Sequence, residues 1–219
     1  MLELVIADKN YSSWSMRPWV LMRHLGLDFT ERLIRLDQPD TAARISAISP
    51  AGRVPVLLDD GFAVWDSLAI MEYLADCTPA ARVWPADLRQ RARARSVAAE
   101  MHAGFQALRG GMSMNIRKRS PGLGHTPEVL ADVARIDAMW SELLAAYGGP
   151  FLFGADFTAA DAMYAPVVMR FVTYAAPLSA AAQAYVAAVQ ALPAVAEWIA
   201  AAHADPVEIA KYDRPHNAA

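Results

Sequence analysis

The sequence predicts an α/β N-terminal domain with the element order βαβ–ββα, followed by an all-α C-terminal domain built as a helical bundle. Strand-like apolar runs occur only up to residue 65. A stretch with prolines and no periodicity, Cys77–Asp87, comes after one further helix. Beyond it, apolar residues recur at helical spacing. We place the boundaries at 1–76 for the α/β domain, 77–87 for the linker and 88–219 for the helical domain.

Composition indicates a globular protein. The chain has 219 residues, of which 55% are hydrophobic and 20% are charged, enough to fold around a sizeable core. The net charge of -3 gives no electrostatic footprint for nucleic acid, and the basic clusters at 89–95 and 117–119 are interpreted as solvated helix faces. The single cysteine, Cys77, excludes an internal disulfide framework and a cysteine-rich metal site.

Targeting and membrane signals are not found in the sequence. The start, MLELVIADKN, lacks the basic-then-apolar pattern of a secretion signal. The most apolar region, 180–202, is interrupted by Gln183, Pro193 and Glu197, so no window offers about twenty uninterrupted apolar residues. We expect a soluble, cytoplasmic protein without a membrane partner.

The first strand and the first helix carry the functional prediction. Leu2–Ala7 is typical of a buried strand, and 13–25 has the spacing of an amphipathic helix that ends at Gly26. The helix start holds hydroxyl side chains beside backbone N–H groups without intrahelical partners, and the macrodipole there favours negative charge. We expect this anion to be a thiolate carried by a ligand, because the chain has no cysteine nearby.

The next segment continues the α/β pattern. Phe29–Leu36 has the composition of a second strand, aligned parallel to the first by the helix between them. Asp37–Ala47 is a short helix or an irregular turn, and the breaker cluster Ser49–Gly52 ends it.

A hairpin follows. Val54–Leu58 and Phe62–Trp65 are typical of two strands joined by a turn at Asp59–Gly61. Pro55 is anomalous inside a strand, because proline removes a ladder donor. It indicates either an edge strand or a special turn with a cis peptide bond, which would leave neighbouring backbone groups free for a ligand.

The α/β domain closes with a helix over 68–75. Asp66 and Ser67 supply its N-cap pair. Cys77, near the linker, is interpreted as a small buried residue.

Helices account for the remainder. The pattern predicts one helix over 88–114, a break at Ser120–Gly124 and another helix over 127–147. Thr158 and Asp161 form a capping box, in which Thr158 caps the helix and Asp161 reaches back to its backbone N–H. The last predicted helices span 159–175, 180–191 and 194–203, followed by a polar tail.

Three stretches, Ser12–Arg17, Arg53–Leu57 and Trp65–Ile70, occur in this order along the α/β domain. With the proline-bearing linker and the helical bundle, they resemble the cytosolic glutathione transferases over nearly the whole chain. The first resembles the serine motif of the zeta and plant-type classes. The second resembles the segment with a cis-proline that pairs with the cysteinyl unit, and the third resembles the acid–serine pair that holds the γ-glutamyl end. The resemblance implies a thioredoxin-like N-terminal domain.

The resemblance assigns a glutathione site. Aligning Arg17 with the arginine that follows the family serine by five places selects Ser12 as the catalytic residue, with Ser13 as runner-up, while Ser15 is expected to lie too far into the helix. The hydroxyl would donate to the sulfur and, with the helix N-terminus, lower the thiol pKa from about 8.5 by about one or two units. The implied glutathione-binding residues are Arg53, Val54, Pro55, Asp66 and Ser67.

These residues divide the ligand between them. Ser67 and free N–H groups suit the γ-glutamyl carboxylate, Asp66 suits its ammonium, and Arg53 suits the glycyl carboxylate or the thiolate. Each has a structural alternative: Ser12 and Ser13 as N-caps, the Asp66–Ser67 pair as an ordinary cap, and Arg53 as a surface residue.

An electrophile pocket is predicted on the helix over 88–114. Met101, Phe105 and Met112 give it an adaptable apolar side, for which bundle core is the alternative. His102 is expected to be structural or solvent-facing. Asn115 and Arg117 are candidates for contact with a polar substrate.

The sequence departs from the family pattern at one position. Zeta-class members, the isomerases of maleylacetoacetate, normally carry a cysteine where this chain has Trp14. This departure weakens the isomerase interpretation, and the absence of a motif cysteine argues against the disulfide chemistry of omega- and beta-like members.

We therefore expect a glutathione transferase that conjugates the glutathione thiolate to small electrophiles, with glutathione as co-substrate and no metal. The alternatives are a glutathione-dependent cis–trans isomerase, a peroxidase, or a non-catalytic glutathione-binding module. The resemblance also implies a homodimer.

Overall fold

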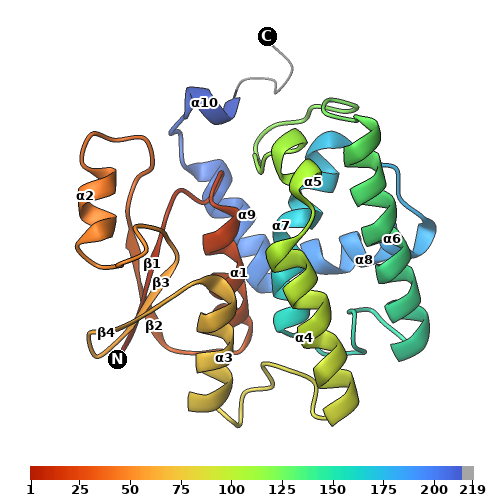
Figure 1. Cartoon of the computed structure of the whole chain (residues 1–219), viewed down its shortest axis with the longest axis horizontal. Coiled ribbons are helices and arrows are strands. Elements are labelled where there is room, and N and C mark those ends of the chain that lie inside the picture. The colour runs from red at the N-terminus through yellow and green to blue at the C-terminus, as the bar shows by residue number, and fades with distance from the viewer. Residues whose placement is uncertain (214–219) are drawn as a thin grey trace.

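A computed structural model describes residues 1–213 of the chain (Figure 1). Its N-terminal part is a four-stranded mixed sheet with the strand order β2-β1-β3-β4, in which β1 and β2 are parallel and the other two pairs are antiparallel. The strands are β1 (Leu2–Ile6), β2 (Phe29–Leu33), β3 (Val56–Asp59) and β4 (Phe62–Trp65), and the helices are α1 (Ser13–His24), α2 (Thr41–Ser46) and α3 (Ser67–Cys77). The predicted βαβ–ββα order is confirmed.

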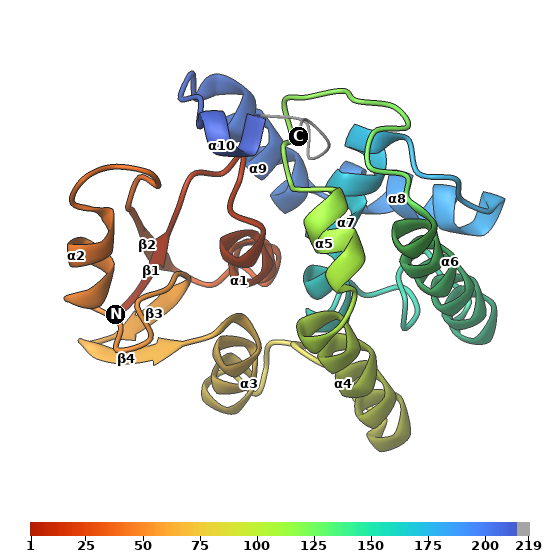
Figure 2. The same ribbon diagram turned by 45° about the horizontal axis from the view of Figure 1, so that its top comes forward.

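Each face of the sheet is covered by different helices (Figure 2). Because side chains alternate along a strand, Leu4 and Leu57 point into the main core with α1 and α3. Their neighbours Val5 and Val56 pack on the opposite face against Ile45 of α2. The serine-bearing helix α1 is thereby held against the sheet by buried apolar side chains.

Two strands are shorter than predicted. The segment after Leu33 leaves the sheet because β1 has already ended, and the last inter-strand N–H, that of Ile34, bonds to the Ile6 carbonyl at 2.9 Å. β3 begins at Val56, so Pro55 lies just before the strand, and the Val54–Pro55 bond is cis. The structure therefore favours the special turn over the edge strand.

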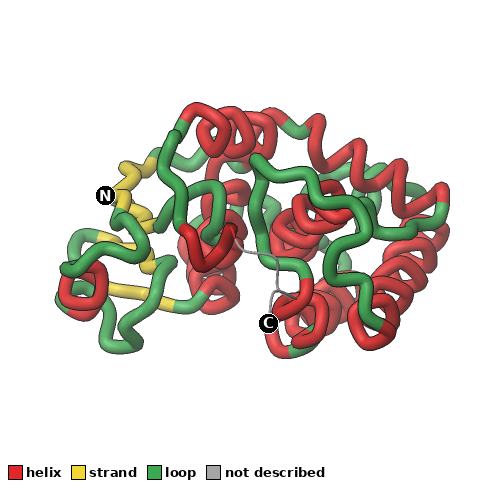
Figure 3. Tube along the Cα trace, turned by 90° about the horizontal axis from the view of Figure 1, so that it is seen from above, coloured by secondary structure: helices red, strands yellow, loops and turns green. Residues whose placement is uncertain are grey.

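The C-terminal part is entirely helical within the described residues (Figure 1). Figure 3 shows the sheet at one end of the molecule and these helices at the other. They are α4 (Leu88–Ala103), α5 (Gln106–Gly111), α6 (Pro127–Tyr147), α7 (Ala159–Tyr174), α8 (Ala180–Ala191), α9 (Pro193–Ala204) and α10 (Ala210–Asp213).

The predicted single helix over 88–114 is wrong, because the chain turns between α4 and α5. Gly104 has an extended backbone and Phe105 a left-handed one, with φ 58°. A side chain at Gly104 would place its Cβ 2.7 Å from the Glu100 carbonyl oxygen, so this turn requires glycine. Arg109 then donates to the carbonyls of Gly104 and His102 at the end of α4.

The predicted capping box at the start of α7 is confirmed. The carboxylate of Asp161 accepts from the backbone N–H and the hydroxyl of Thr158, from the Leu152 N–H and from the Tyr185 hydroxyl, at 2.9–3.1 Å. Burial raises the pKa of Asp161 to about 6, although these hydrogen bonds favour its charged form. The box ties α7 to the preceding loop and to α8.

Helix α1 lies between the sheet and the helical domain, where it packs against α7 and α9 (Figure 2). The prediction that Cys77 is buried is wrong: it is the last residue of α3, which runs two residues beyond its predicted end, and its side chain is exposed. The domain boundaries stay predictions.

No single helix within residues 1–213 is long and apolar enough to cross a membrane. Helices α8 and α9 reach that length and composition only as a pair, with a bend of 74° between them.

Candidate functional site

Ser12 lies at the end of the loop that connects β1 to α1, and 8% of its surface is exposed. Its backbone N–H donates to the Asp8 carbonyl at 2.8 Å, and its side chain makes no capping hydrogen bond to α1. Ser12 is therefore the N-cap residue of α1 by position, but within the described residues its hydroxyl bonds to no backbone N–H of the helix.

Ser15 is the partner of Ser12. The two hydroxyl oxygens lie 2.7 Å apart, with Ser12 donating, and Ser15 also accepts from the Ala7 N–H at 3.1 Å. Ser15 is fully buried one helical turn into α1. It is thus part of the serine arrangement, as the three-residue spacing from Ser12 on one helix face indicates, although the sequence analysis placed it out of reach.

Ser13 faces a different neighbour. Its hydroxyl accepts from an Nη of Arg170, on α7, at 3.2 Å, and both residues are buried. A hydroxyl that accepts this bond keeps its own proton to donate. Ser12 and Ser13 therefore offer distinct donors at one helix start.

The start of α3 forms the second part of the site. Asp66 is its N-cap, as predicted: one carboxylate oxygen accepts from the Leu68 and Ala69 N–H groups at 2.9 and 3.3 Å. Asp66 holds a positive φ of 78°, a conformation that non-glycine residues adopt at a cost and often at functional positions. The next residue, Ser67, is fully buried and accepts from Arg17 at 3.4 Å.

The segment before β3 offers unpaired groups. Within residues 1–213, the Val54 N–H and C=O have no hydrogen-bond partner. The Arg53 side chain is exposed and forms no ion pair or hydrogen bond in that part of the chain. Because backbone polar groups seek partners, this turn is suited to a ligand that supplies both a donor and an acceptor.

Three guanidinium groups gather behind the serines: Arg17 from α1, Arg109 from α5 and Arg170 from α7. Among the described residues, none of them pairs with a carboxylate; their partners are hydroxyls and backbone carbonyls. The Nε of Arg17 is buried without any partner. Such a cluster favours a bound anion.

Burial and mutual repulsion act on this arginine cluster. Burial, followed by the charges of Arg109 and Arg170, lowers the pKa of Arg17 well below its usual value. Burial likewise lowers the pKa of Arg170 to about 10. An anion placed among the three guanidinium groups would raise the pKa of Arg17 and of Arg170 toward the usual value, because it favours their charged forms.

Trp14 stands beside two of these cations. Its ring centre lies 4.0 Å from the Arg17 guanidinium carbon and 4.9 Å from that of Arg109. The edge of His102 also meets this ring, at 5.3 Å, and the His102 Nε2 lies 3.3 Å from the second oxygen of Asp66. Trp14 therefore connects the serine-bearing helix α1 to α4 and α5.

The predicted electrophile-pocket residues are buried. Met101 and Met112 are 2% and 0% exposed and belong to the main core, and Phe105, at 7%, forms the turn between α4 and α5. Their role in a pocket stays a prediction. Asn115 and Arg117 bind the chain itself: Asn115 contacts Asn10, and Arg117 donates to the Tyr11 hydroxyl.

The sequence analysis did not find Arg109 and Arg170. No motif marks them, because each stands alone in an apolar helical pattern and meets Arg17 only through the tertiary fold. The sequence offers one signal for Arg170: it is a charged residue within an otherwise apolar run of α7, where a buried position is expected.

Comparison with protein families gives two matches. The model described as glutathione S-transferase, N-terminal domain, matches residues 11–77, and the model described as glutathione S-transferase, C-terminal domain, matches residues 88–201.

Curated relatives are similar over about three quarters of the chain. A probable maleylacetoacetate isomerase of Caenorhabditis elegans is 28% identical over 158 residues, which cover 72% of this chain and 73% of that protein. A zeta-class glutathione S-transferase of Euphorbia esula is 27% identical over 165 residues, covering 74% and 73%.

Solved structures agree in fold. A glutathione transferase homologue from Burkholderia GL BGR1, determined with bound glutathione, superposes with a TM-score of 0.72 at 25% identity, covering 93% of this chain and 99% of that one. A bacterial maleyl pyruvate isomerase described as zeta class has a TM-score of 0.73 at 21% identity, covering 94% and 100%, and shows the shared fold alone.

Proposed function

The chain belongs to the glutathione S-transferase family, and we propose that it binds glutathione at the starts of α1 and α3, ionises the thiol at Ser12 and conjugates the glutathione thiolate to a small electrophile. The observation that carries the proposal is the hydroxyl of Ser12, which lies at a helix start without capping it. Ser13 is the runner-up, because its hydroxyl accepts from Arg170 and keeps its own proton to donate, whereas Ser12 donates to Ser15 until the sulfur binds.

The thiolate chemistry rests on Ser12 and Ser15. Ser12 donates to the sulfur, and the Ser12–Ser15 hydrogen bond then reverses, so that Ser15 donates to Ser12. Ser15 can do this because a hydroxyl has one proton and two lone pairs, and Ser15 keeps accepting from the Ala7 N–H. The proton of the thiol leaves to water, and the charge that remains on sulfur is stabilised by this donor and by the N-terminus of α1.

Glutathione binding rests on the two polar segments described above. The free N–H and C=O of Val54 pair with the cysteinyl unit beside the cis Pro55 bond. Ser67 and the start of α3 take the γ-glutamyl carboxylate, Asp66 attracts its ammonium, and the unpaired Arg53 reaches the glycyl carboxylate.

The arginine cluster favours an electrophile that bears a carboxylate. Within the described residues, Arg17, Arg109 and Arg170 carry positive charge that no carboxylate contacts directly, although Asp66 lies close enough to attract Arg17. This observation supports a second candidate function, the cis–trans isomerisation of an unsaturated keto acid, which the names of several relatives suggest. In that reaction the thiolate adds to the double bond, rotation follows, and elimination returns the glutathione unchanged.

We propose a homodimer as the working form. Phe62 and Trp65 on β4 are 65% and 44% exposed, and Leu88 at the start of α4 is 70% exposed. Exposed large apolar side chains of this kind suit a surface buried between two copies. The cytoplasmic location stays a prediction.

Calorimetric titration with glutathione, run beside two activity assays, tests the proposed function. One assay follows conjugation to chlorodinitrobenzene, and the other follows isomerisation of maleylacetoacetate with free thiol measured in parallel. We expect glutathione to bind and substrate to be turned over. In the second assay, conjugation consumes the free thiol and isomerisation leaves its concentration unchanged. Binding without turnover in either assay would support a binding module or a peroxidase, and the absence of binding would overturn the proposal.

A further inference from the structure

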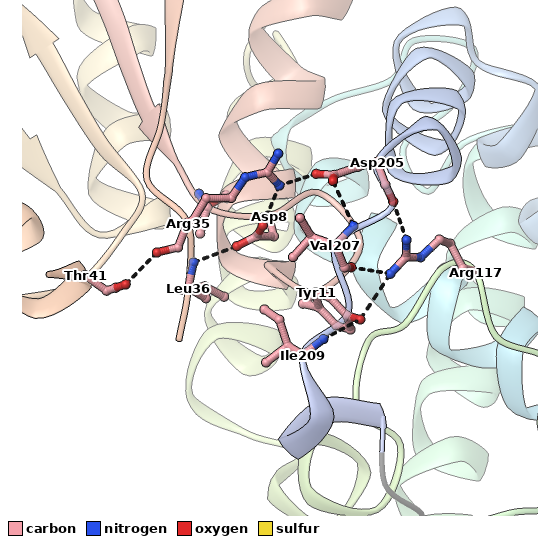
Figure 4. A network of polar contacts seen from close by, with 11 residues as sticks. Asp8, Tyr11, Arg35, Leu36, Thr41, Arg117, Asp205, Val207 and Ile209 are labelled. Carbon is pink, nitrogen blue, oxygen red and sulfur yellow. Dashed lines mark hydrogen bonds and ion pairs between the residues drawn. The ribbon is translucent and has the colours of Figure 1, made fainter. Parts of the chain in front are cut away.

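The last described residues of the chain lie along the loop that carries Ser12 (Figure 4). We call residues 7–12 the serine loop and residues 205–213, which follow α9, the C-terminal strap. Although the two segments are about two hundred residues apart in sequence, the strap is joined to the loop by side chains of Asp8 and Tyr11 and by Arg117 from the chain after α5.

Tyr11, the residue directly before Ser12, is the first junction. Its hydroxyl donates to the Asp213 carboxylate at 3.0 Å and accepts from the Ile209 N–H at 3.1 Å and from Arg117 at 3.2 Å. One donated and two accepted bonds use the full capacity of a hydroxyl. Only 7% of Tyr11 is exposed, and its bond with the Ile209 N–H is buried, whereas its bonds with Asp213 and Arg117 are partly buried.

Arg117 is the second junction. One Nη donates to the Asp205 carbonyl, and the other donates to the Val207 carbonyl and to the Tyr11 hydroxyl (Figure 4). A planar guanidinium holds such a fork in fixed geometry, which a single ammonium group cannot reproduce. Arg117 thus fixes the strap and the serine loop relative to each other.

The third junction is an ion-pair chain at the other end of the loop. Arg35, which follows β2, bridges the carboxylates of Asp8 and Asp205. The second oxygen of Asp8 accepts from the Leu36 N–H at 2.7 Å, and the Asp8 carbonyl receives the N–H groups of Tyr11 and Ser12. The backbone hydrogen bond of Ser12 therefore ends on a residue that the strap holds.

Asn10, in the serine loop, joins the loop to the segment that follows α5 in the helical domain. Its amide donates to Asn115 at 2.9 Å and accepts from the Arg117 N–H at 3.0 Å. The serine loop is thus attached to the sheet, to the segment after α5 and to the strap. Within residues 1–213, the one side-chain partner of Ser12 is Ser15.

We infer that Tyr11 and Arg117 are positioning residues for the thiolate: by fastening the C-terminal strap to the serine loop, they set where the Ser12 hydroxyl lies relative to the glutathione sulfur. The inference rests on the proposed function, because it takes Ser12 as the donor to that sulfur. Neither residue touches the ligand in this account, and both act through the backbone of the serine loop.

The test compares Tyr11→Phe, Arg117→Met and Arg117→Lys with the wild type. In each, ultraviolet absorbance follows the titration of the bound glutathione thiol, and steady-state kinetics give kcat and KM for glutathione. We expect Tyr11→Phe and Arg117→Met to raise the titration midpoint by about half a unit or more. We expect kcat to fall about fivefold with little change in KM, because binding groups elsewhere are untouched. Arg117→Lys should not restore the wild-type values, since it keeps the charge but not the fork.

Matched controls remove the same kinds of contact elsewhere. Arg91 also donates to two backbone carbonyls, those of Pro85 and Ala86, and the Tyr73 hydroxyl donates to Asp59 at 2.8 Å. Arg91→Met and Tyr73→Phe should leave the thiol titration unchanged.

The outcomes separate the inference from the proposed function. If the wild type shows no lowered thiol midpoint, the proposed function fails. If the wild-type midpoint is lowered but Ser12→Ala does not change it, Ser12 is not the donor and the inference loses its premise. If Ser12→Ala raises the midpoint but Tyr11→Phe and Arg117→Met do not, the inference alone is overturned. Full recovery in Arg117→Lys would overturn it too, because charge would then suffice. Tyr11→Phe, which keeps the ring, decides the question if Arg117→Met does not fold.

Discussion

At the start of α1, three serines within four residues have three different partners. Ser12 bonds to Ser15, Ser13 bonds to Arg170, and Ser15 accepts from the Ala7 N–H. None of these hydroxyls caps the helix in the manner that their position suggests. The residues are therefore arranged to present donors at a positive helix end, which is what a bound thiolate needs.

The buried hydroxyl of Ser15 gives a first prediction. Ser15→Ala removes the partner of Ser12 and leaves the Ala7 N–H unsatisfied in the core. We expect the bound thiol midpoint to rise, by less than in Ser12→Ala, and the free energy of unfolding to fall by about 1–2 kcal/mol. Absorbance titration and denaturant unfolding measure the two effects. Unchanged titration would remove Ser15 from the thiolate network.

The arginine cluster gives a second prediction. Arg170→Met removes one of the guanidinium groups that lack a carboxylate partner. We expect KM for an electrophile that bears a carboxylate to rise about tenfold, through the loss of a charge-assisted hydrogen bond. KM for the neutral chlorodinitrobenzene serves as the internal control and should change little. An equal effect on both substrates would point to a role of Arg170 in folding rather than in recognition.

At the scale of elements, helix starts place the hydroxyl groups and the acid of the proposed site. The start of α1 holds the serines, the start of α3 holds Asp66 and Ser67, and the capping box fixes the start of α7, which carries Arg170. Helix α7 packs against α1, so an error in the position of its first turn would be transmitted to Ser13. The capping box therefore supports the site without touching it.

The pKa of Asp161 predicts a pH dependence of stability. The pKa is about 6 in the folded protein against 3.8 for a free aspartate, so between these values the folded state binds more protons than the unfolded state. The contribution of Asp161 to stability is therefore complete below about pH 4 and is lost as the pH rises through about 6, by about 3 kcal/mol.

Comparison with Asp161→Asn isolates this effect, because asparagine does not titrate. We expect the variant to be less stable than the wild type, since its amide NH₂ donates where a carboxyl oxygen of Asp161 accepts from the Thr158 N–H and hydroxyl or from the Leu152 N–H and Tyr185 hydroxyl. The stability difference should be larger at pH 4 than at pH 7, as measured by urea unfolding. A difference that grows toward pH 7 would contradict the assignment.

At the scale of the whole molecule, the site is assembled from parts distant in sequence. The sheet and α3 supply the ligand-binding turns, α5 and α7 supply arginines, and the C-terminal strap closes on the serine loop (Figures 1 and 4). Substituting a single polar side chain of one of these parts is expected to alter the thiolate rather than to abolish the fold, because the main core is formed by apolar side chains that stay in place.

The exposed apolar side chains give a prediction for assembly. Phe62→Ser should weaken the proposed homodimer, because the ring is 65% exposed in the single chain and would be buried between two copies. Sedimentation velocity at several protein concentrations measures the change. A wild-type protein that stays monomeric at high concentration would contradict the dimer, and an unaltered dimer in Phe62→Ser would exclude this surface.

Local patterns predicted what is local in this molecule. The hairpin turn at Asp59–Gly61, the cap at Asp66 and the Thr158–Asp161 box follow from turn and cap chemistry within a few residues, and all three are present. The break at Gly104 was missed because the helical apolar spacing continues across it, and only the clash with the Glu100 carbonyl reveals the turn.

Long-range contacts could not be predicted in the same way. Arg17, Arg109 and Arg170 meet only after α1, α5 and α7 pack, and no spacing in the sequence connects them. Arg117 was a candidate for substrate contact. Its sequence position cannot show that its two Nη groups donate to the strap and to Tyr11. The contact of Ser15 with Ser12 could have been predicted from the sequence, because helical periodicity places residues three apart side by side.

The most direct test of the account is the titration of the bound glutathione thiol in the wild type, Ser12→Ala and Ser13→Ala. The account predicts a wild-type midpoint about one to two units below that of free glutathione and its return toward the free value in Ser12→Ala. If Ser13→Ala has this effect and Ser12→Ala does not, Ser13 is the donor. A wild-type midpoint equal to that of free glutathione would contradict the central claim that the start of α1 stabilises a thiolate.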